Sequence, residues 1–216
     1  MNVRLLLLLV VPLVLSSCQK KDEPAETTAA ATPARSSAPL AADSAEVRDP
    51  SGAVLATLKT GSVLEAVLGP ADRSRVLRGQ LRDDGKRAYA QVGGAELGEV
   101  KPGDEGFKLK SPDSRLLWKV KLKDGKVKIS DNEENARPVV VKVREGFLEV
   151  ENDGVPAGSV RFDAATGLAR VLDATGAEVG VVKARGLSAG WALLLVPRVP
   201  EAERCVLQLE LLSRGL

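Results

Sequence analysis

Lysines alternate with apolar residues along a short stretch in the middle of the chain. The seven lysines of this stretch are Lys108, Lys110, Lys119, Lys121, Lys123, Lys126 and Lys128. Because successive side chains of a β-strand point to opposite faces, this spacing puts the ammonium groups on one face and the apolar residues on the other. The simpler interpretation is a solvated face that keeps strand edges from pairing with other chains. The functional alternative is contact with an anionic surface, because ammonium groups attract phosphate and carboxylate groups.

The 216-residue chain contains no histidine and only two cysteines. Ser-His-Asp and Cys-His catalysis need an imidazole, and many zinc and iron sites need it as a ligand. Two cysteines are too few for a four-cysteine zinc site. An enzyme would therefore depend on Asp, Glu, Lys or Tyr89, and no spacing singles out a carboxylate pair for glycoside hydrolysis among the 29 acidic residues. We expect a non-enzymatic protein without catalytic residues, bound metal or cofactor.

The charges are nearly balanced, with 31 basic and 29 acidic residues. This composition gives no indication of nucleic-acid binding. One acidic run, residues 130–135, has oxygen ligands that calcium could use, but it lacks the spacing and the central glycine of an EF-hand. A polar loop is the simpler interpretation of this run.

The first 18 residues read MNVRLLLLLVVPLVLSSC, in which Arg4 precedes an apolar run of eleven residues, 5–15. As a helix this run would reach only ~16 Å, whereas the hydrocarbon core of a bilayer is ~30 Å thick. It is typical of a signal peptide. Its end, Leu15-Ser16-Ser17-Cys18, resembles a bacterial lipobox, which implies a signal peptide at 1–17 and lipidation of Cys18. The alternative is an ordinary secreted protein that is cut near the same place.

Residues 18–44 are predicted to form a lipidated, disordered tether, because Leu40 is their only large apolar side chain. Gln19, by resemblance to enteric sorting rules, favours the outer membrane. If Cys18 carries lipid, Cys205 has no disulfide partner and is expected to be a buried, inert thiol. Residues 45–216 are predicted to form one β-rich domain.

Short alternating strands and glycine turns fill most of this domain. Asp124-Gly125 is a strong two-residue hairpin signal. It would place Lys121 opposite Lys128 and Leu122 opposite Val127, so that one face is apolar and the other basic. A second hairpin with the turn 145–146 would place Lys142 opposite Glu149 and Val141 opposite Val150. Residues 62–68 are apolar enough to form a short helix instead of a strand.

The sequence also contains an internal echo. Residues 94–101 (GAELGEVK) and 176–183 (GAEVGVVK) are identical at six of eight positions, with an offset of 82. The echo predicts two related halves of one β-structure, although chance similarity between glycine-rich hairpins would give the same match.

Two apolar segments follow the predicted strands. Residues 188–196 are apolar all round, with Ser188 placed as an N-cap, which predicts a buried helix or a short buried strand. Residues 200–213 have one apolar stripe and predict a second, amphipathic helix.

The segment FKLKSPDSRLLWKVKLKDGKVKISD, residues 107–131, with the strands and the apolar segment after it, resembles the Tubby-like superfamily, which includes LURP-one-related and phospholipid-scramblase-like domains. The resemblance covers residues 86–213. It implies a closed antiparallel β-barrel of about a dozen strands around a buried C-terminal helix, here 191–196. The second helix, 200–213, departs from the family pattern and is expected outside the barrel. Functions in this superfamily include phosphoinositide binding and proposed lipid scrambling.

We therefore expect a bacterial lipoprotein held at the outer membrane by its lipid anchor, acting as a non-catalytic binding or scaffold module. Its partners would be the membrane and an anionic lipid or envelope polymer, and not nucleic acid. The alternative is a lipid-handling, scramblase-like domain, which a large apolar cavity would favour.

Overall fold

A computed structural model describes residues 43–216 of the chain. The predicted signal peptide, Cys18 and nearly all of the predicted tether lie outside the described residues. The first strand begins at Ser44, which the sequence had suggested as the last residue of the tether.

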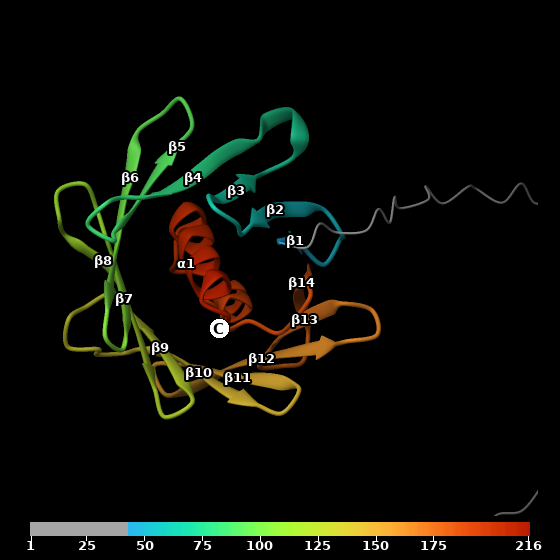
Figure 1. Cartoon of the computed structure of the whole chain (residues 1–216). Helices are drawn as coiled ribbons and strands as arrows, with labels where there is room; N and C mark the ends of the chain where they lie inside the picture. Colours follow the sequence, from blue (N-terminus) through green and yellow to red (C-terminus); the bar gives the residue numbers. More distant parts are fainter. Residues whose placement is uncertain (1–42) are drawn as a thin grey trace, which may run out of the picture. The chain divides into compact units, whose positions relative to one another are not determined.

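The described residues form fourteen antiparallel strands in which each strand pairs with the next, and β1 pairs with β14 to close a barrel (Figure 1). The prediction of a mainly-β antiparallel barrel is therefore confirmed. The strands are β1 (Ser44–Arg48), β2 (Val54–Lys59), β3 (Leu64–Leu68), β4 (Arg75–Leu81), β5 (Arg87–Gln91), β6 (Glu96–Gly103), β7 (Gly106–Lys110), β8 (Leu116–Lys123), β9 (Lys126–Ser130), β10 (Val139–Arg144), β11 (Phe147–Asn152), β12 (Val155–Asp163), β13 (Leu168–Asp173) and β14 (Glu178–Lys183). A short 3-10 helix, η1 (Ala71–Arg73), connects β3 to β4.

The hairpin of β8 and β9 has the predicted register, with Lys121 opposite Lys128 and Leu122 opposite Val127. Its turn residues Asp124 and Gly125 both have positive φ angles, 53° and 68°, as a tight two-residue hairpin requires. The second predicted hairpin is also confirmed, since β10 and β11 place Lys142 opposite Glu149 and Val141 opposite Val150. Local turn chemistry and period-2 alternation were therefore sufficient to set both registers.

The internal echo corresponds to two hairpins with the same register. Tyr89 pairs with Gly98 in β5–β6, and Val171 pairs with Gly180 in β13–β14, 82 residues further along. In both hairpins the register shifts immediately after that pair. Adding the same offset of 82 to the bounds of β1 (44–48) gives the bounds of β9 (126–130). The repeat is therefore structural as well as sequential.

The helix inside the barrel is α1 (Glu201–Ser213), which Figure 1 shows surrounded by the ring of strands. The sequence had suggested that this segment lies outside the barrel, and that suggestion was wrong. All residues from Cys205 to Leu211 are buried, including Gln208 and Glu210. Thirteen residues without an internal glycine or proline give a helix of ~20 Å, long enough to fill the interior between the strands.

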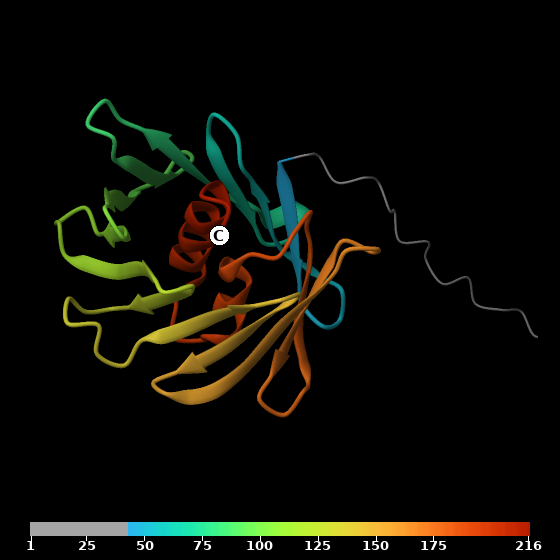
Figure 2. The ribbon, with the colours of Figure 1, turned by 60° about the horizontal axis from the view of Figure 1, so that its bottom comes forward.

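The segment expected to be the central helix forms a 3-10 helix, η2 (Ala189–Leu195), with Ala189 to Leu193 buried. Ser188 caps it as predicted, since its hydroxyl accepts a hydrogen bond from the Gly190 amide. The segment is bounded by Pro197, which is too close to allow a long α-helix. It packs against β10 to β14 on the inner side of the barrel, while α1 packs against η2, β2 and β3 (Figure 2).

The stretch 62–68 is not helical. Leu64, Ala66 and Leu68 are buried along β3, and the residues between them are half-buried. This alternation of period 2 fits a strand, and the pairing of β3 with both β2 and β4 outweighs the weak helical preference of five residues.

Candidate functional site

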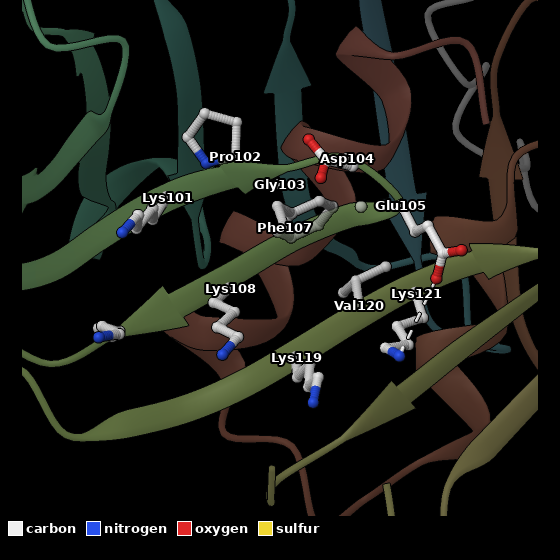
Figure 3. A pocket seen from close by; sticks show the side chains of 12 residues that line it. Lys101, Pro102, Gly103, Asp104, Glu105, Phe107, Lys108, Lys119, Val120 and Lys121 are labelled. Carbon is white, nitrogen blue, oxygen red and sulfur yellow. Dashed lines mark ion pairs between the residues drawn. The ribbon is translucent and has the colours of Figure 1, made fainter. Parts of the chain in front are cut away.

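The predicted lysines lie on the outer face of neighbouring strands, which we call the lysine face. Lys108 of β7 pairs with Lys119 of β8, and Lys121 of β8 pairs with Lys128 of β9. The apolar residues between them, such as Val120 and Ile129, are buried inside the barrel. Figure 3 shows several of these ammonium groups together on one side of β6, β7 and β8. The structure therefore brings the sequence-predicted lysines onto one continuous surface.

Sequence reasoning missed one member of this surface. Lys101 of β6 lies directly opposite Lys108, so that a row of three lysines crosses β6, β7 and β8. The signal was weak because Pro102 argues against a strand and the turn Asp104-Glu105 lacks a glycine.

A cavity of about 480 Å³ lies along this row (Figure 3). Five lysines and two acids contribute to its walls, with Pro102, Phe107 and Val120 among the other lining residues. The lining residues are Lys101, Pro102, Gly103, Asp104, Glu105, Gly106, Phe107, Lys108, Lys110, Lys119, Val120 and Lys121. Gly106 allows the strands to approach here, because a Cβ at its position would lie 2.1 Å from the carbonyl oxygen of Val120. The cavity combines an excess of positive charge with an apolar contribution from the strands.

One carboxylate of the chain already binds two lysines of the face. Glu133, in the loop between β9 and β10, forms ion pairs with Lys108 at 2.8 Å and with Lys119 at 3.1 Å. Hydrogen bonds from Lys108 and then Lys119 lower the pKa of Glu133 below its usual value. Lys119 is only 13% exposed. Glu133 therefore marks the position in which an external anion would meet two ammonium groups.

Lys121 lies 4.0 Å from Glu105, at the limit of an ion pair. The other lysines of the face form no ion pair or hydrogen bond through their ammonium groups within residues 43–216. These are Lys101, Lys110, Lys123, Lys126 and Lys128. Lys110 and Lys128 are half-buried and the other three are exposed. Like charges on adjacent strands repel each other weakly, so an added anion would lower the electrostatic energy here.

A second charged cluster lies inside the barrel. The fully buried carboxylate of Glu210 on α1 accepts hydrogen bonds from the Tyr89 hydroxyl at 2.9 Å and from Arg87 at 2.7 Å. Arg214 donates to its other oxygen at 3.0 Å. Burial, together with the charge of Glu210, raises the pKa of Tyr89, so the phenol stays protonated as a donor. Tyr89 thus serves to satisfy a buried carboxylate, a role that its sequence position did not reveal.

Cys205 is buried on α1, as predicted. Burial raises the pKa of its thiol to about 12, which leaves it protonated at neutral pH. Among the described residues, no three side chains of the Asp, Glu, Cys and His types gather as a metal site. In residues 43–216, no helix has the length and apolar character needed to cross a bilayer.

Comparisons of the chain with family models, curated proteins and solved structures found no match. The resemblance to Tubby-like domains and the lipobox both remain predictions from the sequence.

Proposed function

We propose that the protein is a lipid-anchored module of a bacterial envelope, without catalytic activity, whose lysine face binds an anionic surface. The observation that carries this proposal is the row of Lys101, Lys108 and Lys119 across β6, β7 and β8, beside which Lys121 of β8 lies opposite Lys128 of β9. Anionic headgroups attract such lysines by about 1 kcal/mol each near the surface. Binding to an anionic surface would explain why the barrel presents several ammonium groups that its own acidic side chains do not neutralise.

The proposed anchor at Cys18 complements this surface. The lipobox implies at least two acyl chains on Cys18, and two chains make a stable anchor without a further signal. The lysine face would then bind an anionic lipid or envelope polymer while the lipid holds the protein at the outer membrane.

The interior of the barrel supports a binding module in preference to a lipid-handling domain. α1 and η2 occupy the space enclosed by the strands, and their side chains join those of the strands in one buried core. A domain that shields acyl chains would need an apolar cavity in place of this packed core.

The test is binding of the full chain carrying Cys18→Ser to vesicles with and without phosphatidylglycerol, so that no acyl chain on Cys18 contributes. We expect preferential binding to the anionic vesicles and its loss when Lys119, Lys121 and Lys128 are changed to Glu. The matched control changes Arg78, Arg144 and Arg170 to Glu. These arginines pair with acidic side chains elsewhere on the barrel. Two results together would refute the proposal. One is equal binding to vesicles with and without phosphatidylglycerol, and the other is equal binding to vesicles with and without lipopolysaccharide.

A further inference from the structure

The interior cluster around Glu210 carries more positive than negative charge. Arg87 and Arg214 contribute two guanidinium groups, Glu210 contributes one carboxylate, and Tyr89 is neutral. The Glu210 carboxylate is fully buried, whereas the side chains of Arg87 and Arg214 are 21% and 31% exposed. Two guanidinium groups therefore pair with one buried carboxylate and still reach solvent.

Both guanidinium groups have hydrogen-bond donors to spare. Arg87 donates to Glu210 through Nη1 alone, and Arg214 donates through Nε and Nη2. Arg87 also lies within hydrogen-bonding reach of the Tyr89 oxygen, and within residues 43–216 no acceptor is bonded to Nη1 of Arg214. Arg214 is also held in place from another side, because its guanidinium carbon lies 4.9 Å from the centre of the Phe107 ring. The remaining donors are consequently pre-organised.

These donors face a second cavity, of about 520 Å³, where α1 ends. Arg87, Arg214, Ser213 and Thr60 line it, and they supply charged and hydroxyl groups from three separate parts of the chain. Asp43 also lines the cavity, and because Asp43 and Arg214 are both exposed, water screens the charges of both side chains. A volume of this size accommodates a small molecule.

From this arrangement we infer that the cavity where α1 ends is a binding site for the oxyanion group of a small polar molecule, held by Arg87 and Arg214. Guanidinium groups bind phosphate and carboxylate oxygens through parallel hydrogen bonds, which an ammonium group cannot reproduce. A bound oxyanion would accept hydrogen bonds from guanidinium donors that Glu210 does not use, and the hydroxyls of Thr60 and Ser213 would contact the polar body of the ligand. Neither arginine belongs to the lysine face, although Arg214 contacts Phe107, which lines the cavity along that face.

The test is isothermal titration calorimetry of the full chain with inorganic phosphate and, separately, with citrate. We expect saturable binding of at least one of them, weakened at least tenfold in Arg214→Met. Methionine keeps an apolar side chain near Phe107, and Arg87 and Tyr89 still bond Glu210. The control is Arg170→Met, an equal change of charge on the outer surface, where Arg170 pairs with Glu178; its affinity should not change.

Glu210→Gln provides a second, opposite readout that does not remove a ligand group. It leaves two guanidinium groups without their internal counter-ion, so phosphate or citrate should bind more tightly than to the unchanged protein. Binding of phosphate alone would identify a phosphate-bearing ligand, and binding of citrate alone a carboxylate. The inference is overturned if neither anion binds, if Arg170→Met weakens binding as much as Arg214→Met, or if Glu210→Gln leaves affinity unchanged or lower.

Discussion

Two neighbouring hairpins of the barrel both have two-residue loops, and their outward charges follow different patterns. In β8–β9, lysines lie opposite lysines on the outer face, at the pairs 121–128 and 123–126. In β10–β11, Lys142 lies opposite Glu149, and ion pairs join Lys142 to Glu151 and Arg144 to Glu149. Both hairpins bury an alternating apolar face, so the fold itself requires neither pattern.

This contrast distinguishes charged side chains that stabilise the barrel from charged side chains that are available to bind an external anion. Opposite charges across strands contribute about 0.2–1 kcal/mol each, and directly opposed like charges are destabilising. The β10–β11 hairpin uses its charges for its own stability. The β8–β9 hairpin has like charges opposite each other and lacks this stabilisation, as expected of a surface that binds an external anion.

The largest effect should come from giving β8–β9 the charge pattern of its neighbour. Lys126→Glu with Lys128→Glu removes two lysines from the lysine face, each worth about 1 kcal/mol near an anionic surface. Binding to phosphatidylglycerol vesicles should weaken at least about 30-fold, measured by sedimentation.

The same variant should unfold at a higher urea concentration, because it creates opposite-charge pairs with Lys123 and Lys121. The reverse exchange in β10–β11, Glu149→Lys with Glu151→Lys, should lower stability and leave vesicle binding no weaker. Unchanged binding in the first variant would mean that the contrast between the hairpins has no role in binding.

A smaller effect should come from removing the internal anion of the lysine face. Glu133→Gln frees Lys108 and Lys119 from their ion pairs, so vesicle binding should strengthen about fivefold, which corresponds to about 1 kcal/mol. Glu134→Gln is the matched control, since this neighbour in the same loop forms no ion pair within residues 43–216. Weaker binding by Glu133→Gln would show that Glu133 shapes the site instead of competing for it.

The smallest effect concerns the dependence of stability on pH. The pKa of Glu133 is lowered in the folded protein from an ordinary value of 4.5, so its ionised form stabilises the fold above that pH. This contribution is lost as the pH falls through the lowered pKa. The unfolding midpoints of the unchanged protein and Glu133→Gln should therefore differ slightly at pH 7 and converge at pH 2.5. A difference that is independent of pH would exclude this ion pair as its source.

Much of the lysine face could be predicted from the sequence, because alternation with apolar residues fixes which side chains share a face of a strand. Both hairpin registers followed from their two-residue turns. Lys101 and Glu133 could not be placed in this way. Lys101 is separated from the face by an atypical turn, and Glu133 reaches Lys108 from a loop 25 residues further along the chain.

The interior was predicted least well. The sequence indicated two apolar C-terminal segments but assigned the central position to 191–196 and left 200–213 outside. The reason lies in Glu210 and Gln208, which suggest a solvent-facing side of the second helix. A buried carboxylate is stable only when it has partners, and Tyr89 and Arg87 are more than 120 residues away in the chain.

The sequence by itself determined the local conformation: short strands with one apolar face, tight turns, and a row of outward lysines. These follow from interactions between residues that are near one another in the chain. Only the tertiary structure decided that fourteen strands close into a ring, which helix fills it, and which distant charges meet. Those outcomes depend on closing β1 onto β14 and on partners for buried polar groups, and neither is encoded in any short segment.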